Sequence, residues 1–84
     1  MPDRELMTEV ADLVRAAAKI RPEVAVAAES HLVDDLAIDS LDLVGVFLKL
    51  QDRYDLAIED EEMPTLLRIS DLARYVADNR ARAA

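Results

Sequence analysis

The sequence contains no cysteine and no tryptophan, and it has only one glycine and three prolines among 84 residues. Without cysteine, the chain forms neither a disulfide nor a thiolate metal site. A chain of this length buries only about 60% of its unfolded surface, so a compact helical core is the simplest route to stability. The prevalence of alanine, leucine, valine, arginine and the acidic residues agrees with a helical protein.

Positive charge and long apolar runs are also scarce. The chain has 18 acidic and 10 basic residues and a net charge of −8. This charge disfavours nucleic acids and anionic membranes as partners and favours basic proteins, although it can equally serve only solubility. No run approaches the ~20 apolar residues of a membrane span, and residues 1–5 lack the features of a signal peptide. We therefore expect a cytoplasmic monomer with one domain, residues 1–84.

Two long helices are predicted in the first two thirds of the chain. The first covers residues 3–20, where Asp3 is the expected N-cap and Pro22 follows the end, because the residue before proline leaves helical geometry. The second covers residues 40–54 and has Asp39 as its expected N-cap. Apolar residues recur at helical spacing in both segments.

The remainder of the chain predicts a third helix and a short one. The third covers residues 69–79, with Ser70 as a candidate cap, and a short acidic helical turn at residues 59–62 is limited by Pro64. The fold class is therefore all-α: a small four-helix bundle of three longer helices and one short helix, with a long loop at residues 21–38. The residues expected to point inward from this loop are Val24, Val26, Leu32, Val33 and Leu36.

The second helix has more apolar surface than one core-facing stripe requires. Its core-facing stripe consists of Leu43, Val46, Phe47, Leu50 and Tyr54. A second apolar stripe, on another side, consists of Leu41, Val44 and Leu48, with Gly45 beside it. Either the helix is buried nearly all round, or the second stripe is a surface for a partner.

The most specific segment of the sequence surrounds Ser40. It reads Asp35-Leu36-Ala37-Ile38-Asp39-Ser40-Leu41-Asp42. This segment resembles the phosphopantetheine attachment motif of acyl carrier proteins, usually Asp-Leu-Gly-x-Asp-Ser-Leu-Asp. The resemblance continues through the acidic residues 59–62 and the pattern at residues 69–76, and so covers most of the chain. The first turn of a helix also suits an attached phosphate, because its free amides and dipole favour negative charge.

The resemblance implies a non-catalytic carrier with a covalent cofactor. A phosphopantetheinyl transferase would move 4′-phosphopantetheine from coenzyme A to Ser40, with Asp39 assisting the magnesium site of that enzyme and Leu41 packing against it. Acyl groups would then be carried as thioesters to fatty-acid, polyketide or related enzymes, including ketosynthases and acyl-transfer or acyl-loading enzymes. No catalytic residue and no metal site are expected in the chain itself.

The resemblance also implies a partner-binding face and an acyl slot. The expected partner-binding residues are Asp39, Leu41, Asp42, Val44, Gly45 and Leu48. The candidate walls of a slot for the acyl chain are Val33, Val46, Phe47, Leu50, Ile58, Leu66 and Ile69. These slot residues are equally the expected core, and the sequence does not separate the two roles.

Three features depart from the pattern of the family. Ala37 stands where glycine is common, and since alanine does not take positive φ freely, we expect a different local path before Ser40. Gly45 stands where many fatty-acid carriers have an acidic residue, and Lys49 and Arg53 add positive charge to a helix that is typically acidic. We therefore expect a specialised carrier with a thin acidic docking strip.

Four other functions are alternatives to an acyl carrier. A serine hydrolase needs a base, and the only histidine, His31, is expected to be a loop residue; the Gly-x-Ser-x-Gly elbow is absent. A calcium loop lacks the required glycine and spacing. A peptidyl or aminoacyl carrier shares the serine arm but usually has a Gly-Gly-x-Ser motif and less negative charge. A carrier-like interaction module without the arm remains an alternative.

Overall fold

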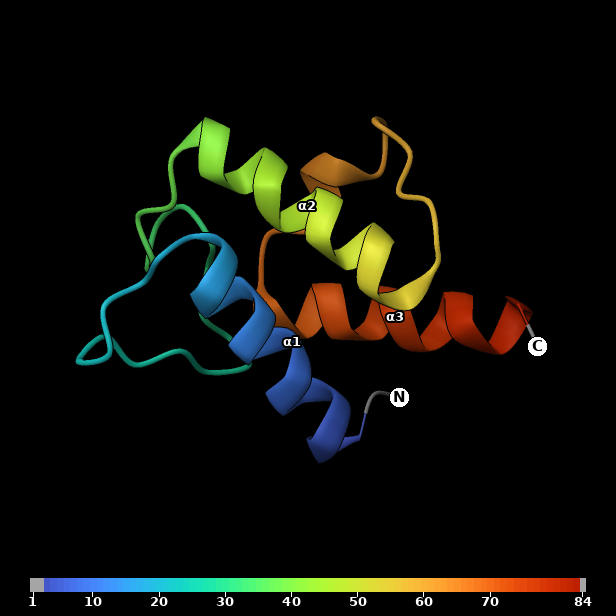
Figure 1. The fold of residues 1–84 in the computed structure, drawn as a ribbon, viewed down its shortest axis with the longest axis horizontal. Coiled ribbons are helices and arrows are strands. Elements are labelled where there is room, and N and C mark those ends of the chain that lie inside the picture. The colour runs from blue at the N-terminus through green and yellow to red at the C-terminus, as the bar shows by residue number, and fades with distance from the viewer. Residues whose placement is uncertain (1–2, 84) are drawn as a thin grey trace.

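Three α-helices and one short 3-10 helix form the regular secondary structure in the computed structural model, which describes residues 3–83 (Figure 1). Their bounds are α1 Arg4–Ala17, α2 Ser40–Tyr54, η1 Met63–Thr65 and α3 Ile69–Ala83. The predicted all-α fold, with three longer helices and one short helix, is confirmed. Helix α1 packs against both α2 and α3. Among the described residues, no helix is both long and apolar enough to cross a lipid bilayer.

Helix α1 begins where the sequence predicts and ends earlier. Asp3 is its N-cap, since its Oδ1 accepts a hydrogen bond of 2.8 Å from the backbone N–H of Leu6. The predicted end near residue 20 is wrong, because the helix ends at Ala17. Lys19 has a φ of 55°, and this left-handed conformation interrupts the right-handed helix before the proline is reached.

A single arginine holds the chain that follows α1. The guanidinium of Arg15 donates hydrogen bonds to the carbonyl oxygens of Arg21, at 3.1 Å, and Val24, at 2.9 Å. The chain therefore folds back along the last turn of α1. These contacts connect residues six and nine positions apart, so helical periodicity alone did not predict them.

Helix α2 has the predicted bounds, whereas α3 is longer and is capped differently. The residue after α2, Asp55, closes the helix in a left-handed conformation with a φ of 52°. Helix α3 continues beyond the predicted end at residue 79, to Ala83. Ser70 is not its cap and lies inside the first turn. Instead, Oδ2 of Asp71 accepts a hydrogen bond of 3.1 Å from the backbone N–H of Arg68.

The short helix lies after the acidic residues and not within them. Residues 60–62 form turns, and η1 begins at Met63. Pro64 was predicted to limit the helix but occupies its first turn, where a missing N–H is tolerated. The segment is held to α3 by Tyr75, whose hydroxyl lies 2.6 Å from Oε2 of Glu62.

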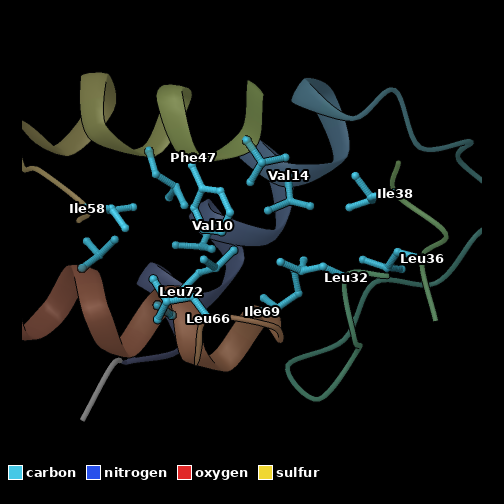
Figure 2. Packing of buried hydrophobic residues seen from close by; sticks show 14 of the residues in the cluster. Val10, Val14, Leu32, Leu36, Ile38, Phe47, Ile58, Leu66, Ile69 and Leu72 are labelled. Carbon is cyan, nitrogen blue, oxygen red and sulfur yellow. The ribbon is translucent and has the colours of Figure 1, made fainter. Parts of the chain in front are cut away.

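The core is formed by apolar side chains from all three α-helices and from the loops between them (Figure 2). The helices contribute Leu6, Val10, Val14, Val46, Phe47, Leu50, Ile69, Leu72, Ala73 and Val76, and the loops and η1 region contribute Leu32, Leu36, Ile38, Ile58 and Leu66. Full burial of a leucine or isoleucine contributes about 1.5 to 3 kcal/mol each. The loop residues therefore add substantially to the stability of a small core.

The connection between α1 and α2, residues 18–39, lies at the end of the molecule opposite the C-terminal end of α3 (Figure 1). Its anchors are Leu32, Leu36 and Ile38, which are buried. The prediction that Val33 points inward is wrong, since this side chain is 45% exposed. Residues 32–36 form turns of helical type, in which positions four apart share a face, so Leu32 and Leu36 point to the core and Val33 points away.

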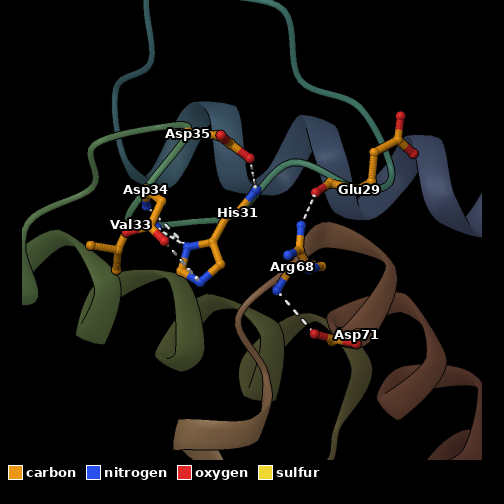
Figure 3. Close-up of polar contacts among 7 residues, drawn as sticks. All are labelled: Glu29, His31, Val33, Asp34, Asp35, Arg68 and Asp71. Atoms are coloured by element: carbon orange, nitrogen blue, oxygen red, sulfur yellow. Dashed lines mark hydrogen bonds and ion pairs between the residues drawn. The ribbon is translucent and has the colours of Figure 1, made fainter.

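The second half of the connection pairs with the start of α3 in what we call the seam, residues 28–32 against residues 67–70. The backbone N–H of Leu32 donates to the carbonyl oxygen of Leu67 at 2.7 Å, and that of Ser70 donates to Ala28 at 2.8 Å. The guanidinium of Arg68 donates to the carbonyl oxygen of Glu29 at 2.6 Å (Figure 3). The seam fixes a loop that has no regular secondary structure of its own.

Ala37, at the end of this loop, takes the backbone conformation that glycine favours. Its φ is 54°, and its N–H donates to the carbonyl oxygen of Val33 at 3.0 Å. The expectation that alanine avoids positive φ here is therefore wrong. The buried side chain of Ile38 and the 3.1 Å hydrogen bond from its N–H to Leu32 hold the chain on both sides of the strained residue.

We expect Ala37→Gly to raise the free energy of unfolding by about 0.5 to 1 kcal/mol. A left-handed L-residue costs about 1 to 2 kcal/mol, and the greater freedom of glycine in the unfolded chain offsets part of that gain. Urea unfolding measures the change. The matched control is Ala25→Gly, at an exposed loop position without positive φ, which should be neutral or destabilising. Equal effects of the two substitutions would contradict strain at Ala37.

Candidate functional site

Ser40 is the first residue of α2, and its side chain is exposed. Asp39 is the N-cap, since its Oδ1 accepts a hydrogen bond of 2.8 Å from the N–H of Asp42 and its carbonyl oxygen accepts one of 2.9 Å from the N–H of Leu43. The amides of the first turn have no intrahelical acceptor, and the helix dipole adds partial positive charge there. The hydroxyl of Ser40 therefore lies at a helix end that favours a phosphate.

Two observations show that this position accommodates a large covalent group. The neighbouring side chain, Leu41, is 80% exposed, and the backbone before Ser40 is fixed by buried Ile38 and by the cap at Asp39. A group on the Ser40 oxygen would thus extend into solvent from a rigid base. These residues fit a phosphate ester of phosphopantetheine without displacing any core side chain.

The remaining apolar surface of α2 faces away from the core. Its inward side chains, Val46, Phe47 and Leu50, are buried (Figure 2). Its outward side chains are Leu41, 80% exposed, Val44, 53% exposed, and Leu48, 59% exposed. The alternative that α2 is buried nearly all round is therefore wrong. We call the surface formed by Leu41, Val44, Gly45 and Leu48 the outward face.

Gly45 leaves open space in the middle of the outward face. A Cβ built at this position meets no atom within 4 Å. The residue has no positive φ, so its backbone does not require glycine. Because glycine has no side chain, the helix backbone is exposed between Leu41 and Leu48. A partner that docked there could approach the backbone closely.

The two basic residues of α2 have different surroundings. Arg53 lies 3.7 Å from Oε1 of Glu9 and 6.0 Å above the ring of Tyr54, so its charge is directed toward α1. Lys49 is exposed and forms no ion pair with any described residue. Only Lys49 therefore adds a free positive charge beside the outward face, next to the exposed carboxylate of Asp52.

A surface groove of about 610 Å³ runs between α1 and α2, and the sequence did not predict it. Its lining residues are Glu9, Asp12, Leu13, Ala16, Ala17, Lys49, Asp52 and Arg53. None of the predicted slot residues lines it. Six of those residues, Val46, Phe47, Leu50, Ile58, Leu66 and Ile69, lie in the packed core, while Val33 is exposed.

Two acidic side chains near Ser40, those of Asp35 and Asp39, accept local hydrogen bonds from backbone N–H groups. Oδ2 of Asp35 accepts from the backbone N–H of His31 at 2.7 Å, and Oδ1 of Asp39 caps α2. Among the residues that the structure describes, no group of three histidine, cysteine or acidic side chains could hold a metal ion. Nδ1 of His31 accepts two backbone N–H groups, so its lone pair is not available to activate a serine hydroxyl.

Comparison with known proteins identifies relatives of most of the chain. A family model described as a phosphopantetheine attachment site matches residues 8–76. An acyl carrier protein of Campylobacter fetus subsp. fetus (strain 82-40) is 37% identical over 68 residues, which cover 81% of this chain and 87% of that protein. An acyl carrier protein of Brachyspira hyodysenteriae (strain ATCC 49526 / WA1) is 31% identical over 75 residues, covering 89% and 96% of the two chains.

A solved structure agrees with these sequence matches. The solution structure of a protein from Anaplasma phagocytophilum, assigned as an acyl carrier protein, superposes with a TM-score of 0.84 at 30% sequence identity. The superposition covers 94% of this chain and 92% of the other. The likeness therefore extends over all four helices and the connection before α2.

Proposed function

We propose that Ser40 carries the phosphopantetheine arm of this chain, which belongs to the acyl carrier protein family. The function of the chain is that of an acyl carrier, with covalently attached 4′-phosphopantetheine as its cofactor. One observation supports the choice of residue: Ser40 has an exposed hydroxyl at the first turn of α2, inside the matched residues 8–76. When bound, the arm supplies a terminal thiol on which acyl groups are held as thioesters.

The residues around Ser40 define what the chain contributes to its modification. A phosphopantetheinyl transferase transfers the arm of coenzyme A to Ser40. The Ser40 oxygen bonds to the phosphorus of the arm, the pyrophosphate P–O bond of coenzyme A breaks, adenosine 3′,5′-bisphosphate leaves, and the hydroxyl proton is released. The first-turn amides and the helix dipole then stabilise the negative charge of the phosphate. Asp39 holds the turn in shape through its bond to Asp42, and its exposed carboxylate assists the magnesium site of the transferase. The exposed side chain of Leu41 packs against that enzyme.

The outward face is the proposed docking surface for the enzymes that use the carrier. Exposed apolar side chains in one patch are typical of a protein interface. The patch begins at Leu41, directly after Ser40, so a docked partner holds the arm near its own active site. The outward face and its acidic neighbours comprise Asp39, Leu41, Asp42, Val44, Gly45 and Leu48, which are the residues predicted from the sequence.

The chemistry of the outward face favours a specialised carrier. Gly45 supplies no carboxylate, and Lys49 adds positive charge, so docking depends more on apolar contact than on an acidic strip. The proposed partners are ketosynthases and acyl-transfer or acyl-loading enzymes of fatty-acid, polyketide or related synthesis. We place the chain in the cytoplasm as a monomer, where coenzyme A and these enzymes are found.

Incubation with coenzyme A, magnesium and a broad-specificity phosphopantetheinyl transferase should add one phosphopantetheine to the chain. Intact mass spectrometry measures the gain, and Ser40→Ala should abolish it because the accepting oxygen is removed. Ser70→Ala is the matched control, because the Ser70 bond in the seam is made by its backbone N–H and is retained, and this variant should load normally. A folded, unmodified chain that gains no mass would contradict the proposal and favour an interaction module.

Substitutions at Gly45 test the outward face. Both Gly45→Ala and Gly45→Glu should raise the free energy of unfolding, by about 1 kcal/mol for alanine, because glycine is unfavourable within a helix and a side chain has open space there. Only Gly45→Glu should raise the affinity for a ketoacyl synthase of broad carrier specificity, by about tenfold, since it restores a carboxylate where many fatty-acid carriers have one and attracts a basic partner. Calorimetric titration measures the affinity, and equal values for all three chains would refute docking at this face.

A further inference from the structure

His31 caps the turn that leads to Ser40, and it does so with the lone pair of its imidazole. Nδ1 accepts hydrogen bonds from the backbone N–H of Val33, at 3.2 Å, and of Asp34, at 3.0 Å (Figure 3). The backbone N–H of His31 in turn donates to Oδ2 of Asp35 at 2.7 Å. This reciprocal arrangement resembles a capping box, with a histidine where serine or threonine is usual and with the returning carboxylate four residues after the cap instead of three.

Only the neutral imidazole can form this cap. Both groups that Nδ1 faces are N–H donors, so Nδ1 must be unprotonated and the ring proton must lie on Nε2. A protonated ring has an N–H on both nitrogens. It would lose both hydrogen bonds and place a third donor against the two amides.

One charged side chain lies close to the ring. Oδ2 of Asp34 lies 3.8 Å from Nε2 and attracts a protonated ring, although this carboxylate is 78% exposed and screened by water. Arg68, paired with His31 across the seam, directs its guanidinium to the carbonyl oxygen of Glu29, and Asp71 accepts from the backbone N–H of Arg68 (Figure 3). The ring itself is only 16% exposed.

The capped turn is continuous with the site of modification. His31 also accepts, through its carbonyl oxygen, the N–H groups of Asp35 and Leu36 at 3.0 Å each. The turn then ends at Ala37 in a left-handed conformation, and the next residue, Ile38, is buried before Asp39 caps α2. A strained residue persists only where its surroundings hold it. Loss of the cap therefore loosens residues 31–39, the segment that a transferase must contact to reach Ser40.

We propose that His31 is a positioning residue for the modification of Ser40, and that it acts only in its neutral form. Protonation draws the ring toward Asp34, frees the amides of Val33 and Asp34, and slows attachment because the enzyme must then reorder the loop. The effect on modification rests on the proposed function of Ser40, whereas the cap and its release do not.

Nuclear magnetic resonance tests the cap on the unmodified protein. At pH 7.5, the ¹⁵N shifts of the imidazole should report an unprotonated Nδ1 with the proton on Nε2. Between pH 7.5 and 5.5, the amide signals of Val33 and Asp34 should move with the same midpoint as the His31 ring. A proton on Nδ1 at pH 7.5, or amide signals that do not follow the ring, would overturn the proposal.

A competition between variants tests the positioning role. His31→Ser retains an acceptor that does not titrate, and His31→Ala removes the acceptor. Wild type and one variant compete for the same transferase and coenzyme A, and mass spectrometry resolves the two loaded products, so the pH dependence of the enzyme cancels. At pH 7.5, the wild type and His31→Ser should be modified at equal rates. At pH 5.5, the wild type should be modified about fivefold more slowly, because one net hydrogen bond corresponds to about that factor in an equilibrium.

The three chains distinguish a pH-dependent cap from a merely structural side chain. The wild type should match His31→Ser at pH 7.5 and approach His31→Ala at pH 5.5. A wild-type to His31→Ser ratio that is the same at both pH values would overturn the positioning role, and this comparison does not depend on whether His31→Ala folds. If Ser40 is not modified at either pH, the proposed function fails. The nuclear magnetic resonance measurement then still tests whether neutral His31 caps the turn.

Discussion

The hydrogen bonds of the seam are the constraint on which the site depends. Residues 18–39 contain no helix or strand, yet they must deliver Ser40 to one place at the start of α2. The 2.7 Å bond from the N–H of Leu32 to Leu67, with the burial of that leucine, ties the loop to α3 and to the core together. Without this tie, the residues before Ser40 would have no fixed position, and ordering them would carry an entropic cost for each residue fixed.

The single glycine of the chain is placed where its conformational freedom is not needed. Among residues 3–83, Lys19, Ala37 and Asp55 take positive φ, which glycine would adopt without strain. Gly45 instead lies within α2, where it lowers helix stability. A residue that is unfavourable for the fold at its own position is best explained by the surface it creates, an open apolar patch beside Ser40. Stability and the proposed docking are thus in opposition at this position.

Much of the fold could be predicted from local signals. Asp3 and Asp39 identified the starts of α1 and α2, since a capping carboxylate and the apolar spacing that follows lie within a few residues of each other. The end of α1 could not be predicted, because it depends on the left-handed Lys19. The predicted cap of α3, Ser70, lies two positions too late, because the side chain of Asp71 accepts a hydrogen bond from the backbone N–H of Arg68.

The sequence predicted those parts of the candidate site whose geometry is local. It did not predict the parts that depend on how the chain folds. Ser40, its cap and the outward face follow from one motif and one helical period. The role of His31 requires the turn that brings its ring to two amides, and the direction of Val33 requires the same turn. The groove between α1 and α2 joins residues about 40 positions apart, such as Glu9 and Arg53, and no periodicity within one helix predicts it.

Native-state hydrogen exchange at pH 7.5 tests most directly the claim that a fixed connection presents Ser40. The decisive amides are those of Leu32, Ala37, Ile38 and Ser70, which donate to backbone oxygens in the loop and the seam. The account predicts that they exchange within about tenfold of the interior amides of α2, because the seam opens only when the core does. Exchange at the rate of an unfolded peptide, with α2 still protected, would contradict it.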